Sequence, residues 1–113
     1  MYTINRQTTV SPVFTFNNST TFQFQTPIPI STTAGAGLMI LSSTAGRVTV
    51  TFYAKHDPNS SDAYLLVDAT GAPVTRSVDA GEYCQIPTEL FPALCVQPVS
   101  SAGVVTARYC LKG

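Results

Sequence analysis

Apolar residues that alternate with polar ones, in short runs bounded by glycine and proline, are the feature that most constrains this chain. In RVTVTFYA (47–54), Val48, Val50 and Phe52 share one face, because successive side chains of a strand point to opposite sides. VVTARYCL (104–111) repeats this pattern. No stretch of a dozen residues shows the 3.6-residue apolar period of a helix. We therefore predict an all-β protein.

Turn sequences separate the remaining strand candidates at about the spacing of eight to twelve residues that is typical of antiparallel sandwiches. DATGAP (68–73) joins two of them, because Gly71 can adopt a positive φ and Pro73 restarts the chain. A chain of 113 residues forms one domain and can bury a core. We predict a jelly-roll-like, antiparallel β-sandwich whose core contains Val48, Val50, Phe52, Val105, Tyr109 and Leu111.

The composition is poor in charge and has no excess of either sign. Six Lys and Arg balance six Asp and Glu, so that only 11% of residues are charged, against about 25% in typical soluble domains. This balance argues against nucleic acid and against a polybasic membrane anchor. The first residues lack the apolar run of a secretory signal, so we expect the chain to be made in the cytoplasm.

No motif predicts an enzyme, a cofactor or a metal. His56 is the only histidine, and no nucleophile motif accompanies it. The run from Asp57 to Asp62 alternates oxygen-bearing residues but lacks the glycine and glutamate of a calcium loop. Three cysteines without a C-x-x-C pair fit neither a disulfide framework nor a zinc site, and we expect reduced, buried thiols at Cys84, Cys95 and Cys110. A sugar site stays open, with Tyr2, Tyr53, Tyr64 and Tyr83 as candidate platforms.

The first third of the chain has no charged residue between Arg6 and Arg47. We divide the single domain into an uncharged N-terminal arm with the first strands (1–46) and a sandwich body (47–113). In VFTF and TFQFQ, Phe alternates with Thr or Gln, and an isolated ribbon of this kind is prone to pair with other chains. One interpretation is that the arm packs on a neighbouring subunit through Phe14, Phe16, Phe22, Phe24, Pro27, Ile28, Pro29 and Ile30. The other is that residues 13–46 form inner strands of the same sandwich.

The second half resembles small all-β bacteriophage virion proteins, most of all the head decoration, or cement, proteins. The resemblance covers about residues 47–113 and rests on RVTVTFYAKHD, AYLLVDATGAPVT, AGEYCQIPTELFPAL, CVQPVSSAG and TARYCLK. In that family a hairpin with a D-x-x-G turn precedes an A-G-x-Y strand, an I-P and F-P segment and two closing strands. The resemblance implies a jelly-roll-like or sandwich fold, often trimeric, that clamps neighbouring capsid subunits.

These features together predict a structural virion protein and no enzyme. It would bind the major capsid protein or other virion subunits, stabilise the assembled head and form a homo-oligomer, with a trimer favoured. The alternative is a carbohydrate- or receptor-binding sandwich module of a phage fibre or of a secreted enzyme.

Overall fold

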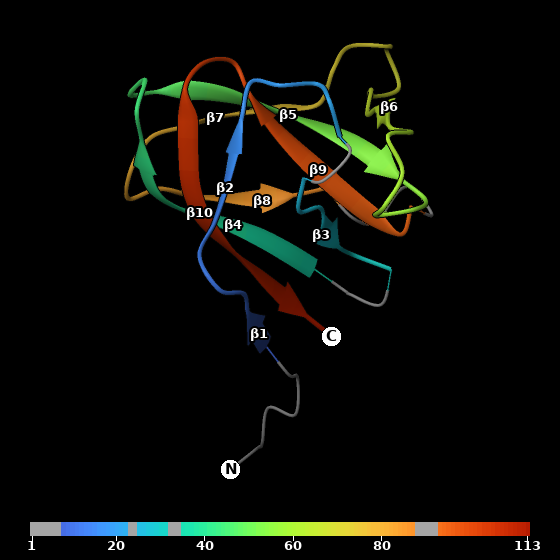
Figure 1. The fold of residues 1–113 in the computed structure, drawn as a ribbon, viewed down its shortest axis with the longest axis horizontal. Coiled ribbons are helices and arrows are strands. Elements are labelled where there is room, and N and C mark those ends of the chain that lie inside the picture. The colour runs from blue at the N-terminus through green and yellow to red at the C-terminus, as the bar shows by residue number, and fades with distance from the viewer. Residues whose placement is uncertain (1–7, 23–24, 32–34, 88–92) are drawn as a thin grey trace.

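Two antiparallel β-sheets pack face to face in the computed structural model, which describes residues 8–22, 25–31, 35–87 and 93–113 (Figure 1). Sheet A contains β1 (Thr8–Val10), β2 (Phe14–Asn17), β4 (Gly35–Ser43), β8 (Tyr83–Ile86) and β10 (Val104–Lys112). Sheet B contains β3 (Ile28–Pro29), β5 (Val48–Lys55), β6 (Tyr64–Leu65), β7 (Thr75–Val78) and β9 (Cys95–Ser100). None of the described residues forms a helix that is long and apolar enough to span a membrane.

The strand order is that of a jelly roll. β1 and β2 both pair with β10, and β6 and β7 both pair with β5, so each couple acts as one interrupted strand. The pairs are then nested along the chain: β1/β2 with β10, β3 with β9, β4 with β8, and β5 with β6/β7. Successive nested pairs alternate between sheets A and B, as in a long hairpin rolled into a double sheet. The predicted fold class is confirmed.

The core lies between the sheets and follows the alternation seen in the sequence. Val48, Val50 and Phe52 of β5 are buried, while Thr49 between them is exposed. On β10, Val105 is fully buried, and Tyr109 and Leu111 are partly buried against the core. The predicted core residues therefore face the interior, because both strands present one apolar face to the opposite sheet.

The N-terminal third belongs to the same sandwich. The boundary proposed at residue 46 falls in the turn between β4 and β5, which are inner strands of sheets A and B. β3 pairs with β9 at the edge of sheet B, a position that tolerates proline because one side of the strand needs no ladder hydrogen bonds. The described part of TFQFQ forms no strand, however, because residues 21, 22 and 25 cross from sheet A onto the outer face of sheet B.

Candidate functional site

The predicted interface residues lie mostly inside their own monomer. Four of them are buried: Phe16, Ile28 and Ile30 lie in the core, and Phe22 packs against Tyr53 of β5. Phe14 and Pro27 are half-buried, Pro29 is exposed, and Phe24 lies outside the described residues. We therefore correct the interface interpretation, since the four buried side chains have no surface left to offer a partner. The alternative of inner packing therefore fits four of the seven described residues of this set.

A strap, defined as residues 18–22 and 25–27, packs part of this uncharged segment against sheet B, while Thr20, Thr21 and Thr26 stay exposed. The Phe22 ring packs on Tyr53 of β5, with 4.8 Å between the ring centroids. Lys55, which is fully buried, donates from Nζ to the Phe22 carbonyl at 3.2 Å and to the Pro58 carbonyl at 3.5 Å. Gln97 of β9 donates from Nε2 to Gln25 Oε1 at 3.3 Å. The strap thus covers the outer face of sheet B, and its Phe and Gln side chains meet the chain's own strands.

The exposed hairpin, residues 64–74, carries the clearest apolar surface. Tyr64, Leu65 and Val67 are 63%, 42% and 45% exposed, and they lie on β6 or directly after it. β6 and β7 pair only with β5 among the described strands, so this side of sheet B is an open edge. Consecutive apolar side chains on an open sheet edge are typical of a protein contact surface.

The tip of the exposed hairpin is held rigid by Asp68. Its carboxylate Oδ1 accepts hydrogen bonds from the Thr70 hydroxyl at 2.6 Å, the Thr70 amide at 2.8 Å and the Ala72 amide at 3.1 Å. Gly71 has a φ of 85°, as the D-x-x-G sequence predicted. The hydroxyl and amide donors of Thr70, followed by the amide of Ala72, hold the pKa of Asp68 below its ordinary value. The exposed residues Tyr64, Leu65 and Val67 therefore lie next to a turn that is fixed by hydrogen bonds.

The catalytic and metal candidates of the sequence are not assembled into a site. His56 is exposed at the end of β5. Burial raises the pKa of the Cys84 and Cys95 thiols, so neither is activated as a nucleophile. Asp57 Oδ1 accepts a hydrogen bond from the Asn59 amide at 2.9 Å, which makes this stretch an Asx turn. In the described part of the chain, no three His, Cys, Asp or Glu side chains gather as metal ligands would.

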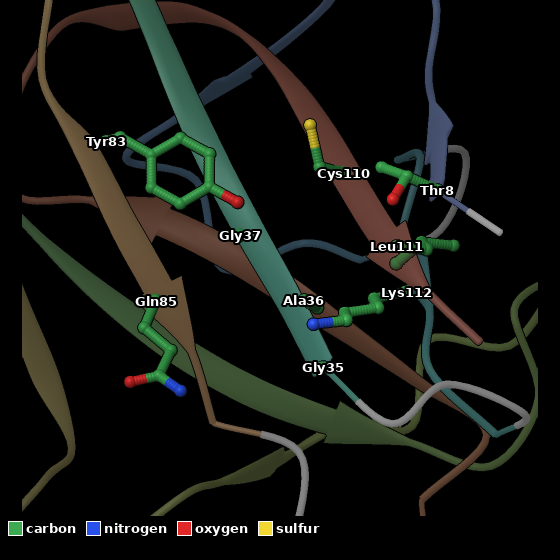
Figure 2. A pocket seen from close by; sticks show the side chains of 9 residues that line it. All are labelled: Thr8, Gly35, Ala36, Gly37, Tyr83, Gln85, Cys110, Leu111 and Lys112. Atoms are coloured by element: carbon green, nitrogen blue, oxygen red, sulfur yellow. The ribbon is translucent and has the colours of Figure 1, made fainter. Parts of the chain in front are cut away.

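A hollow of about 620 Å³ lies on the outer face of sheet A (Figure 2). Its floor is β4, where Gly35 and Gly37 face outward and carry no side chain. Cys110 pairs with Gly37, and Lys112 pairs with Gly35. Larger side chains form the walls, on β8 to one side and on β10 and β1 to the other: Tyr83, Gln85, Cys110, Lys112 and Thr8. The two glycines therefore open a trough between strands that do carry side chains.

Tyr83 lies over this floor. Figure 2 shows its ring across β4 above Gly37, and a Cβ atom at Gly37 would collide with the ring. The residue directly opposite Tyr83 on β4 is Met39, so the ring reaches the diagonal position, as aromatic residues do over sheet glycines. Tyr83 is 61% exposed, which leaves its outer face to solvent. Partial burial, followed by the nearby Cys110 and Cys84, raises the pKa of the Tyr83 hydroxyl.

Sequence reasoning named Tyr83 as a platform candidate but missed the hollow beside it. The sequence signal for the hollow was the pair of alternate glycines in GAG. The sequence does not show which strand lies beside these glycines, because that depends on the register between β4 and β8. Of the other tyrosine candidates, Tyr53 lies under the strap, Tyr64 is on the exposed hairpin, and Tyr2 lies outside the described residues. Comparison with models of protein families, with curated proteins and with solved structures found no match.

Proposed function

We propose that this chain is a structural virion protein, a decoration or cement protein that binds the assembled capsid of a bacteriophage and stabilises it. The observation that carries the proposal is the exposed hairpin, with three solvent-facing apolar side chains on an open sheet edge. Jelly rolls are common among capsid proteins, which agrees with the resemblance of residues 47–113 to decoration proteins. This fold also occurs in lectins, so the fold alone does not decide the function.

The mechanism is adhesion through the exposed hairpin, in place of the buried phenylalanines. Tyr64, Leu65 and Val67 would be covered by the capsid subunit, and the open backbone of β6 would pair with a strand of that subunit. Because Asp68 already fixes the hairpin tip, little conformational entropy is lost when the hairpin docks. The proposed location is the virion, after synthesis in the host cytoplasm.

A second surface would join copies of this chain. β1 and β2 pair only with β10 among the described strands, and Val10 and Val13 beside them are 49% and 47% exposed. This uncharged edge lies within the stretch that has no Asp, Glu, Lys or Arg. Interface cores are depleted in charge, and symmetric closure covers open edges. We place the contacts of a homotrimer at this edge.

Capsid binding tests the role of the exposed hairpin. The double variant Leu65→Asp/Val67→Asp adds two charges to that surface without touching the core. We expect its occupancy on heads of the encoding phage to fall at least about tenfold, because desolvated charges oppose an apolar contact. Co-sedimentation of the purified chain with heads, followed by quantitative electrophoresis, measures this occupancy.

The matched control is Leu41→Asp/Val104→Asp, at two apolar residues of sheet A that are 45% and 40% exposed. It adds the same two charges on another part of the molecule and should keep wild-type occupancy. Circular dichroism verifies that both double variants are folded. Full binding by the hairpin variant, or loss of binding only in the control, would contradict the proposed contact.

A further inference from the structure

The hollow on sheet A has the chemistry of a small-ligand site, and the proposed capsid contact does not use it. It combines one exposed aromatic ring with four polar side-chain groups around a floor of backbone: Tyr83, Gln85, Lys112 and Thr8 supply the hydroxyl, amide and ammonium groups. None of these four groups has a hydrogen-bond or ion-pair partner within the described residues. The groups are therefore free to bind a solute.

The aromatic ring of Tyr83 selects a ligand with a flat, partly apolar face. The ring rests on Gly37 and offers its outer face to solvent, so a ligand can stack on it without moving it. Sugar rings present such a face of C–H groups, and they carry hydroxyl groups around the rim. The trough of about 620 Å³ exceeds the needs of a single hexose and lies in the range of small-molecule sites.

The polar groups select hydroxyl and carboxylate groups. The Gln85 amide both donates and accepts, and the hydroxyl groups of Thr8 and Tyr83 do the same, which matches sugar hydroxyls. Among the described residues that line the hollow, Lys112 is the only charged one, and none of them is a carboxylate. Figure 2 shows the Lys112 side chain extending over β4, toward the floor between Gly35 and Gly37. An acidic ligand group would therefore find an unpaired cation there.

We propose that this hollow binds a saccharide unit that carries a carboxylate, such as a uronic acid residue of a polysaccharide. The sugar ring stacks on Tyr83, its hydroxyl groups bond to Gln85 and Thr8, and its carboxylate pairs with Lys112. The site lies on the outer face of sheet A, whereas the exposed hairpin lies on the edge of sheet B. A capsid-bound chain would leave this site open to the surroundings of the particle.

A glycan array followed by titration calorimetry tests the site. The full chain is first applied to an array of acidic and neutral saccharides. Calorimetry then uses the best acidic oligosaccharide and the same compound with its carboxylate reduced to an alcohol. We expect binding of the acidic form and about tenfold weaker binding of the reduced form, because an ammonium–carboxylate bond is lost. Failure of every saccharide on the array to bind overturns the proposal, and equal binding of both forms overturns the role of Lys112.

Four variants separate the site from the fold. Tyr83→Ala removes the platform and should weaken binding about tenfold or more. Gly37→Ala keeps every lining side chain but displaces the Tyr83 ring, and it should weaken binding to a similar extent. Tyr83→Phe keeps the stacking face and should bind within about threefold of the wild type. Tyr64→Ala is the matched control, because Tyr64 is equally exposed at 63% and lies on the exposed hairpin, and it should bind as the wild type does.

These outcomes are independent of capsid attachment. If Tyr83→Ala binds the acidic saccharide as well as the wild type does, the hollow is not the site. If Tyr64→Ala loses saccharide binding and Tyr83→Ala keeps it, the exposed hairpin is the sugar site instead, and the proposal fails. Co-sedimentation with heads is run on the same variants. Failure of saccharide binding with intact head binding rejects this inference alone, and the reverse result rejects only the decoration role.

Discussion

Lys55 carries an ammonium group that is fully buried, and its partners among the described residues are two backbone carbonyls and the Phe22 ring. Lys55 lies on the face of β5 opposite Val48, Val50 and Phe52, together with Tyr53, because successive side chains of a strand alternate. That face would be solvated in a two-layer sandwich. The strap covers it instead, and the cost of burying the charge is offset by the two carbonyl groups. The alternating pattern of a strand determines the face on which Lys55 lies, but it does not show what covers that face.

Asp68 is the residue for which acid conditions give the clearest prediction. Because its pKa is lowered in the folded state, its charge contributes stability that is complete above the ordinary value of 3.8. This contribution is lost as the pH falls from that value through the lower pKa of the folded chain. Asp68→Asn keeps an oxygen acceptor without the charge, so its melting temperature should lie below that of the wild type at pH 7, by about 2–6 °C.

Calorimetry between pH 7 and pH 2.5 measures that difference. The difference between the wild type and Asp68→Asn should begin to close as the pH falls below about 3.8. It should vanish only below the lowered pKa of Asp68 in the folded chain, because both side chains are then neutral. Asp79→Asn, in the neighbouring turn, serves as the comparison for removal of one carboxylate. A difference that stays constant over the whole pH range would show that the charge of Asp68 does not hold the turn.

Strands whose two faces differ were predictable, and segments that cross between sheets were not. RVTVTFYA and VVTARYCL became β5 and β10, since an alternating pattern fits one dry and one wet face. TFQFQ alternates as clearly, yet its described residues form the strap, because backbone pairing depends on which strand edges lie nearby. The same limit applies to the hollow, where a glycine of β4 meets Tyr83 only through the register of β4 and β8. Contacts of this kind join residues far apart in the sequence, which no local pattern encodes.

The N-terminal elements are expected to be essential for folding. Deletion of residues 1–31 removes β1, β2, the strap and β3, together with four buried apolar side chains: Phe16, Phe22, Ile28 and Ile30. Loss of one large buried side chain costs about 2–5 kcal/mol, and a whole domain is stable by only about 5–15 kcal/mol. The fragment 32–113 should therefore be unfolded, with a narrow range of amide shifts in an NMR spectrum.

Exposed positions of the same segment provide the control for this deletion. The double variant Thr20→Ala/Thr26→Ala alters two exposed side chains. Each substitution should change the free energy of unfolding, measured in urea, by less than about 0.5 kcal/mol. If the fragment 32–113 gave dispersed amide shifts and a cooperative urea transition, the N-terminal segment would be a separable arm after all.

The whole molecule is built from nested strand pairs, and this arrangement determines which edges stay open. The outermost pair joins β1/β2 to β10, and the innermost joins β5 to β6/β7. Each pair leaves one strand at a sheet edge, so the first strands of the chain and the exposed hairpin come to lie at edges of different sheets (Figure 1). The two proposed contact surfaces, the uncharged edge for self-association and the exposed hairpin for the capsid, are thus separate parts of one molecule.

This separation gives a prediction for the oligomeric state. Size-exclusion chromatography with light scattering should give the wild-type chain a mass three times the 12.0 kDa of one chain. Val10→Lys/Val13→Lys places like charges on the uncharged edge of every copy and should yield monomers, because charge at an interface core is costly. Tyr64→Lys/Leu65→Lys, on the exposed hairpin, is the control and should stay trimeric. The mass of the wild type should change little between 0.05 M and 0.5 M NaCl, since residues 8–17 of this edge include no charged side chain. A wild-type chain that elutes as a monomer at all salt concentrations would contradict the trimer, and dissociation of the hairpin variant alone would move the subunit contact to the other edge.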